Sequence, residues 1–219
     1  DLAKAELPFS LHLGDAIDRD FSSFATILPL FSPLGHPVRH LLGNHDYTVA
    51  AEDKAKVVST LGMPRDYYQF RDSGVRFVML DTNDLSTYKH PAGSPQDVES
   101  AAFLKISIEE NLPHAKPWNG GLSETQLKWL EAELTAADME KERVILCGHH
   151  PLLPSDSYRV WNSDAVLALI DRHSSVIAYF NGHNHAGAEE IRNGIPYITF
   201  KSILHEPGVN SFSAIHLFA

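Results

Sequence analysis

The stretch Val144-Ile145-Leu146-Cys147-Gly148-His149-His150-Pro151 joins a short apolar run to a glycine, two histidines and a proline. Four consecutive apolar residues that run into turn-forming residues predict a buried strand. The histidines then follow the carboxyl end of that strand, which is where open α/β sheets place their ligands. The stretch therefore predicts a central strand that delivers metal-binding or proton-handling side chains to one edge of a sheet.

Three further blocks repeat this arrangement, each with a glycine after an apolar run. They are Gly14-Asp15-Ala16-Ile17-Asp18, Gly43-Asn44-His45-Asp46 and Gly182-His183-Asn184-His185. The alternation of apolar strands with helical patterns predicts an α/β sheet that is packed on both faces. We expect strands over 9–13, 38–42, 75–80, 144–147, 175–180, 188–192, 195–200 and 211–218, and helices over 20–34, 50–62, 123–134 and 163–173.

Local signals refine these elements. Ser123 followed by Gln126 predicts a capping box at the start of a helix, and Asn193-Gly194 predicts a hairpin. Residues 83–121 are rich in proline, serine, asparagine and glycine, and a connection of this length is usually functional or mobile. We interpret the chain as a single domain over 1–219, with an insertion at about 83–121 that holds a short helix around 98–109 and lies over or beside the active site.

The composition excludes several classes of protein. The 219 residues carry a net charge of −10 and no cluster of Lys and Arg, which disfavours nucleic acid as a partner. No apolar run approaches the roughly 20 residues needed to cross a bilayer, so we expect no membrane partner. The one cysteine, Cys147, excludes an intramolecular disulfide and agrees with a cytoplasmic protein. The chain begins at Asp1, so a removed signal stays open, as does the oligomeric state.

The four blocks supply ligands for two adjacent divalent cations. The carboxylate of Asp15 can bridge two metals, which two-metal hydrolases hold about 3.5–4 Å apart. Asn44 offers a neutral oxygen, and His183 and His185 can face one metal each. We prefer His149 to His150 as a ligand because it directly follows the glycine. Imidazole with carboxylate suits Zn, Fe or Mn better than Ca.

The remaining side chains of the blocks suit proton transfer. His45 lies beside Asn44, and a histidine there can protonate a leaving oxygen or stabilise charge on a phosphoryl group. Its ring needs an orienting partner, for which Asp18 is the first candidate and Asp46 the second. Together the blocks predict hydrolysis of a phosphate ester or anhydride.

In this order the blocks resemble the calcineurin-like metallophosphoesterase superfamily, whose pattern runs Asp-x-His, Gly-Asp-x-x-Asp, Gly-Asn-His-Asp/Glu, a lone His and Gly-His-x-His. The resemblance implies a four-layer α/β/β/α sandwich and attack by a two-metal-activated hydroxide. It makes His45 the catalytic histidine, paired with Asp18, and it matches Arg19 to an arginine that contacts phosphate. One metal would take Asp15, Asn44, His149 and His183, and the other Asp15 and His185.

A narrower resemblance is to the manganese-dependent ADP-ribose/CDP-alcohol diphosphatases. It rests on the stretches 119–123, 126–130, 151–154 and 160–162. It implies manganese as the metal and a small nucleotide diphosphate as the substrate. Asn44 would help to bind the phosphoryl oxygens, and Trp118 or Tyr88 could stack on a base or ribose.

One part of the family pattern is absent. The Asp-x-His block should precede Gly14 by a strand and a helix, so we expect a sandwich that lacks its first strand and helix. A general phosphomonoesterase or protein phosphatase is the alternative with the same chemistry. A non-catalytic interaction module on the same fold is the alternative of another class. It is disfavoured because Asn44, His45 and both histidines of the last block are intact.

Overall fold

A mixed six-stranded sheet forms the centre of the protein. The computed structural model describes residues 7–205, 208 and 211–217. The strand order is β3-β4-β5-β6-β8-β7, in which β4, β5, β6 and β8 are parallel to one another and the edge strands β3 and β7 are antiparallel to them. The strands are β3 (Tyr68–Asp72), β4 (Val75–Met79), β5 (Arg143–Cys147), β6 (Val176–Asn181), β7 (Ala188–Arg192) and β8 (Ile195–Thr199).

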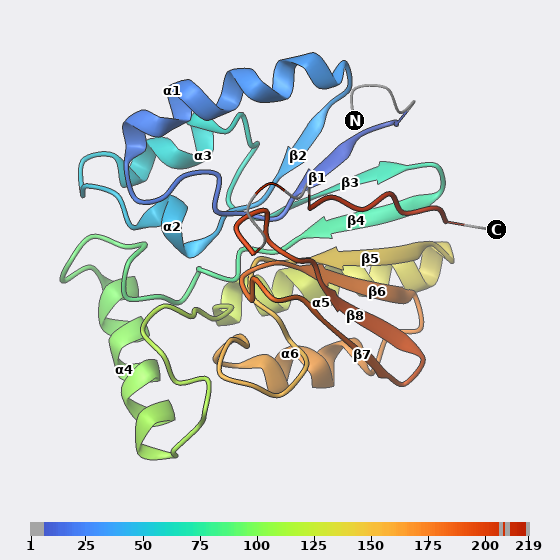
Figure 1. Ribbon diagram of the computed structural model, residues 1–219. Helices are drawn as coiled ribbons and strands as arrows, with labels where there is room; N and C mark the ends of the chain where they lie inside the picture. The colour runs from blue at the N-terminus through green and yellow to red at the C-terminus, as the bar shows by residue number, and fades with distance from the viewer. Residues whose placement is uncertain (1–6, 206–207, 209–210, 218–219) are drawn as a thin grey trace.

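A second, two-stranded sheet lies next to the first. In it β1 (Ser10–His12) pairs in parallel with β2 (Val38–His40). The ring of Phe9 contacts those of Phe70 on β3 and Phe77 on β4, at centroid distances of 5.1 and 5.0 Å. The small sheet therefore packs on the large one, as Figure 1 shows.

Helices form the outer layers. Above the small sheet in Figure 1 runs a helical stretch made of η2 (Phe21–Ser23), α1 (Phe24–Ile27) and η3 (Leu28–Leu34). The short elements α2 (Asn44–Tyr47), η4 (Lys54–Lys56) and α3 (Val57–Thr60) follow β2. The longer helices are α4 (Pro95–Glu109), α5 (Glu124–Glu140) and α6 (Ser163–Ile170). None of these helices of the described chain is long and apolar enough to span a membrane.

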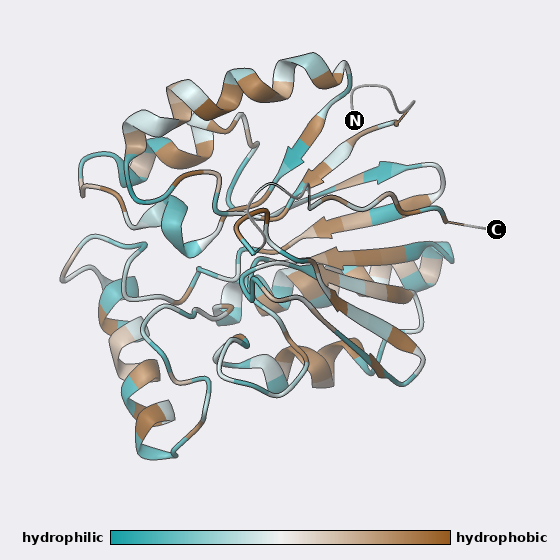
Figure 2. Ribbon diagram, in the orientation of Figure 1, coloured by the Kyte–Doolittle hydropathy of each residue, from teal (hydrophilic) through white to brown (hydrophobic). Residues whose placement is uncertain are grey.

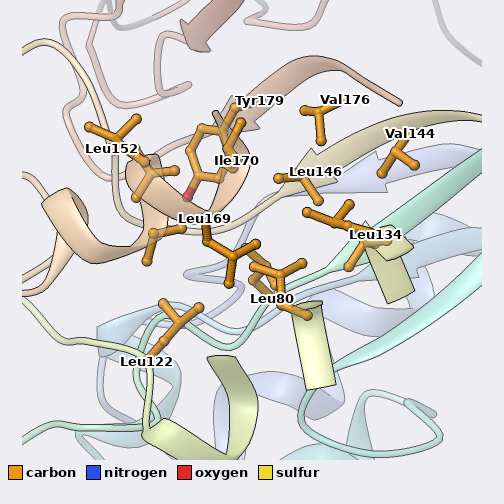
Figure 3. Close-up of a cluster of buried hydrophobic side chains, with 14 of the residues drawn as sticks. Leu80, Leu122, Leu134, Val144, Leu146, Leu152, Leu169, Ile170, Val176 and Tyr179 are labelled. Carbon is orange, nitrogen blue, oxygen red and sulfur yellow. The ribbon is translucent and has the colours of Figure 1, made fainter. Parts of the chain in front are cut away.

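Alternate residues of the central strands enter two separate cores. Val144 and Leu146 of β5 pack with Leu130 and Leu134 of α5 and with the apolar face of α6. Figure 3 shows part of this cluster. The residues between them, Ile145 and Cys147, enter the second cluster, which lies under the small sheet. Figure 2 shows β5 as mostly hydrophobic, as expected for a strand that is buried on both faces.

Most of the predicted elements are confirmed, including the Asn193-Gly194 hairpin, whose two turn residues both have positive φ. The helical stretch predicted over 20–34 is present, although it is largely 3-10 helix, and within 50–62 only η4 and α3 are helical. Two further features differ from the expectation. The strand β3 was not expected. Residues 211–217 form no strand, and Phe218 lies outside the described residues.

The capping prediction at α5 is half right. Ser123 Oγ accepts from Gln126 N at 3.2 Å, which is the first half of a capping box. The Gln126 side chain does not return to Ser123. It accepts from Asp81 N at 2.9 Å and donates to Asp81 O at 2.9 Å, so it ties α5 to the end of β4 instead.

Residues 83–121 leave and rejoin the fold at one point. Leu85 and Gly121 form an antiparallel bridge, with N–H to O distances of 2.9 and 2.8 Å. Between them lies α4, which Figure 1 shows projecting away from the sheets. A small cluster of Leu85, Leu104 and Trp161 anchors it. The last residues of this segment, near Trp118, lie against the loop that follows β5.

Candidate functional site

The four predicted blocks meet at the carboxyl ends of β1, β2, β5 and β6. Two glycines allow this close approach. A Cβ on Gly43 would lie 2.0 Å from Asp15 Oδ1, and a Cβ on Gly14 would lie 2.6 Å from His149 Nδ1. Gly14 also has a φ of 94°, which favours glycine. The spacing of the blocks therefore depends on the absence of side chains at these two positions.

Four acceptor atoms converge on one point between these loops. His149 Nε2 lies 3.3 Å from Asp15 Oδ2, 3.2 Å from Asn44 Oδ1 and 3.2 Å from His183 Nδ1. His149 Nδ1 donates to the carbonyl oxygen of Leu13 at 2.7 Å, so the lone pair of Nε2 faces the cluster. Lone pairs gathered in this way require either a shared proton or a cation between them. The donor set is that of a transition-metal site.

The electrostatics of the cluster agree with a cation site. Burial would raise the pKa of Asp15, but the imidazole of His149 outweighs it and holds that pKa well below its ordinary range. Burial would lower the pKa of His149, yet Asp15 raises it overall. Burial, with His150 and His149 as neighbours, lowers the pKa of His183 well below its ordinary value. The ionised carboxylate of Asp15 and the neutral imidazole of His183 are the forms that bind metal, whereas His149 must give up its proton for a cation to bind there.

His45 lies at the edge of this cluster. Its Nδ1 donates to Asp18 Oδ1 at 2.7 Å, and its backbone N–H donates to Asp15 Oδ1 at 3.0 Å. The His45 side chain is 29% exposed, so its other ring nitrogen is not closed off by the fold. The first candidate for its orienting partner, Asp18, is therefore the residue that contacts it.

Asp46, the second candidate for the partner that orients the His45 ring, binds backbone groups instead. Its fully buried carboxylate accepts from four backbone N–H groups and does not contact the His45 ring. The donors are Asp15 N, Ala16 N, Ile17 N and Gly43 N, at 2.9, 2.9, 3.3 and 2.9 Å. Asp46 thus ties the loop after β1 to the loop after β2.

His150 lies in the cluster, but both of its ring nitrogens already have hydrogen-bond partners outside it. His149, His150 and His183 offer ligand atoms within 4.8 Å of one another. The Trp118 carbonyl oxygen beside His150 Nε2 can only accept, so His150 Nδ1 is the acceptor nitrogen and takes the Thr82 hydroxyl hydrogen at 2.7 Å, while Thr82 Oγ1 accepts from His150 N at 3.1 Å. His150 Nε2 then donates to the Trp118 carbonyl oxygen at 3.3 Å. Burial lowers the pKa of His150 to about 3, which keeps it neutral.

The other predicted site residues lie further out. Arg19 Nε is 3.4 Å from Asp18 Oδ1, and its side chain is 62% exposed. Trp118 is 45% exposed. His185 is also exposed, and within the described part of the chain its ring makes no hydrogen bond. Tyr88, the alternative stacking residue, donates from its hydroxyl to Asn83 Oδ1 at 2.8 Å and packs against the second core.

One contact of the cluster was not foreseen. Asn119 is fully buried, and its Oδ1 accepts from His183 Nε2 at 2.9 Å. Asn119 begins the stretch 119–123, which carries part of the family resemblance. No local sequence pattern, however, indicates a hydrogen bond from Asn119 to a residue 64 positions away. The same holds for the role of Asp46, which depends on how two loops meet.

Comparison with known proteins identifies the class. The Calcineurin-like phosphoesterase family matches residues 3–187, and the chain belongs to this family. It is therefore a metal-dependent phosphoesterase, as predicted. Among solved structures, a dimetal phosphatase from Danio rerio superimposes with a TM-score of 0.83 at 26% identity, covering 94% of this chain and 76% of that one. The predicted fold class and the expectation of two divalent cations are thereby confirmed.

Individual relatives have names that specify a metal and a class of substrate. A manganese-dependent ADP-ribose/CDP-alcohol diphosphatase of Oryza sativa subsp. japonica is 32% identical over 239 residues, which cover 97% of this chain and 74% of the relative. The Homo sapiens protein of the same name is 28% identical over 246 residues, covering 95% and 72%. The narrower resemblance found in the sequence is therefore confirmed.

Proposed function

We propose that this enzyme hydrolyses the diphosphate linkage of a small nucleotide, such as ADP-ribose or a CDP-alcohol, with manganese as its metal. The observation that carries the proposal is the convergence of Asp15, Asn44, His149 and His183 beside the His45–Asp18 pair. The names of the relatives support this substrate class and this metal.

The cluster residues act as the ligands. We assign Asp15, Asn44, His149 and His183 to one ion, and Asp15 with His185 to the other. Two bound divalent ions would lower the pKa of a water molecule and neutralise charge on the phosphoryl oxygens. The chain's own contribution is to hold its ligands deprotonated and fixed, and the His149 bond to Leu13 does so for one of them.

His45 serves as the proton donor to the leaving oxygen. Because Asp18 accepts the hydrogen of Nδ1, the second ring nitrogen of His45 is the one left to deliver a proton. A diphosphate linkage releases a phosphate oxygen whose negative charge a nearby protonated imidazole stabilises. No covalent intermediate is required of any side chain in the cluster.

Substrate contacts extend outward from the cluster. Asn44 and Arg19 would bind phosphoryl oxygens, and the exposed face of Trp118 would stack on the base or ribose. Trp118 lies near the end of the segment 83–121, which we regard as an insertion of a single domain. Its backbone is held at the cluster by the bond from His150 to its carbonyl oxygen. The proposal also places the enzyme in the cytoplasm, with no membrane partner and no nucleic-acid partner, and the net charge of −10 supports the last of these points.

The experiment is a substrate screen of the metal-free chain with added Mn²⁺. The panel holds ADP-ribose, CDP-choline, a phosphomonoester without a base and a phosphopeptide. We expect release of AMP or CMP from the first two and little turnover of the others. Activity confined to the phosphomonoester or the phosphopeptide would favour a general phosphatase. Absence of turnover with every substrate, despite bound metal, would favour the non-catalytic module.

A further inference from the structure

We infer that Asn119 is a positioning residue that selects the tautomer of His183 and thereby presents His183 Nδ1 to the cation. The inference rests on the proposed function, because it takes His183 as a ligand. It assigns a role to the segment 83–121 that goes beyond contact with substrate: the end of this segment would complete the metal site.

The orientation of the Asn119 amide is determined by its surroundings. Its Nδ2 donates to two carbonyl oxygens, that of His114 at 3.0 Å and that of Ser157 at 2.8 Å. These use both amide hydrogens, and a flipped amide would turn its oxygen toward two acceptors. Asn119 is fully buried, so no solvent could compensate for that loss. The oxygen of the amide must therefore face His183.

This orientation decides which ring nitrogen of His183 carries the proton. Asn119 Oδ1 can only accept, and it lies 2.9 Å from His183 Nε2, so Nε2 is the protonated nitrogen. The lone pair is then on Nδ1, which lies 3.2 Å from His149 Nε2 in the centre of the cluster. With the other tautomer, the ring would direct an N–H group at the cation.

The two histidine ligands are thus fixed in different ways. His149 is oriented by the backbone carbonyl of Leu13, which no substitution removes. His183 is oriented by a side chain, so its tautomer can be tested by substitution. Outer partners of this kind usually contribute a factor of 10–100 to metal affinity.

The chain offers a matched control in Asn162. It is another asparagine that anchors the end of the same segment, accepting from Leu122 N at 3.0 Å and donating to Leu122 O at 2.7 Å. Within the described residues its side chain forms no hydrogen bond with a histidine. Asn162→Ala therefore removes a comparable loop anchor and leaves His183 without a direct change.

The experiment compares wild type, Asn119→Ala and Asn162→Ala in two measurements. Imidazole ¹H–¹⁵N spectra of the metal-free proteins report the His183 tautomer, with its signals assigned by their loss in His183→Ala. Electron paramagnetic resonance of free Mn²⁺ reports affinity. We expect the Nε2–H tautomer in wild type and Asn162→Ala. We expect a tautomer mixture in Asn119→Ala, with affinity about 10–100-fold weaker.

Each of the other outcomes would refute either the positioning role of Asn119 or the proposed function. An unchanged tautomer and affinity in Asn119→Ala, or an equal loss in Asn162→Ala, would refute the positioning role. If wild type binds no Mn²⁺ while the tautomer responds as expected, the positioning role stands and the proposed function fails.

Discussion

The backbone N–H of His45 donates to Asp15 Oδ1 at 3.0 Å, so this contact with the Asp15 carboxylate does not depend on the His45 ring. Substitution of the ring should therefore separate proton transfer from metal binding. We expect His45→Ala to lower kcat by about 10²–10⁴-fold, the usual contribution of a general acid, while metal content stays at the wild-type level. Steady-state kinetics and metal analysis of the same preparation test this. Full turnover in His45→Ala would contradict the role.

Substitution of Asp18 should lower kcat less than substitution of His45, the residue it contacts. Its side chain is 80% exposed, so water can replace part of its interaction with the His45 ring. We expect Asp18→Asn to lower kcat by about 10-fold, with no change in metal content. A loss in Asp18→Asn as large as in His45→Ala would show that Asp18 does more than orient the ring.

Asp15→Asn should abolish tight binding of the metal pair. The substitution removes the negative charge that His149 stabilises, and an amide bridges two cations poorly. Calorimetric titration with Mn²⁺ should show the loss, with Asp20→Asn as an exposed Asp-to-Asn control on the same loop. Two tightly held ions in Asp15→Asn would refute the bridging role.

Gly43→Ala should damage the site through a single methyl group. A Cβ there would lie 2.0 Å from Asp15 Oδ1 and 2.6 Å from Asp15 N, so the loop after β1 must move. We expect a loss of about 1–3 kcal/mol in the free energy of unfolding, together with weaker Mn²⁺ binding. Gly35→Ala is the control: its φ of 71° costs about 1–2 kcal/mol, but nothing lies within 4 Å. Equal Mn²⁺ affinity in both variants would contradict the steric argument.

Trp118→Ala should affect nucleotide substrates selectively. Loss of a stacking face costs about 1–3 kcal/mol per base, which predicts a rise in KM of roughly 10-fold or more with little change in kcat. A phosphomonoester without a base serves as the control substrate. Equal losses for both kinds of substrate would show that Trp118 supports the cluster and does not read the nucleotide.

A carboxylate far from the site should control acid stability. Asp138 accepts from His173 Nδ1 at 2.7 Å and from Ser175 N at 2.9 Å, bonds that join α5 to the start of β6. Burial would raise the pKa of Asp138, but these hydrogen bonds outweigh it and lower the pKa. Its contribution is thus present above the unfolded pKa of about 3.9 and is lost as pH falls through the lower folded pKa.

Urea unfolding over a range of pH tests this contribution. We expect Asp138→Ala to be about 1–2 kcal/mol less stable than wild type at pH 7, and the difference to shrink below about pH 4. Glu99→Ala, which removes an exposed carboxylate of α4, should leave the pH dependence unchanged. A difference between Asp138→Ala and wild type that is the same at pH 3 and pH 7 would contradict the linkage.

The sequence predicts best what depends on neighbouring residues. Apolar runs that end at glycine predicted the strands β1, β2, β5 and β6, and hence the edge where the blocks meet. The strand β3 was missed because only Tyr68 of it is buried, while Arg71 and Asp72 at its end suggest a loop. The Ser73-Gly74 turn that follows, with both φ values positive, was its local signal.

What the sequence could not predict depends on contacts between distant segments. Gln126 has the spacing of a capping residue, yet its amide bonds to the end of β4, 45 positions away. Asp46 and Asn119 likewise take partners that only the folded chain brings near. Residues 50–56 carry helix-forming residues but are mostly exposed, so no packing stabilises a helix there and the chain forms turns.

The bridge between Leu85 and Gly121 affects how readily substrate choice could change in this fold. The two residues hold the ends of a long excursion together, and Tyr88 and Lys89 fasten its first part to the second core and to Asp81, whereas α4 projects away from both sheets (Figure 1). The return stretch near Asn119 contacts His183, one of the predicted metal ligands. A designer could therefore exchange the projecting α4 region to alter which molecules are admitted, while the bond-breaking apparatus stays as it is.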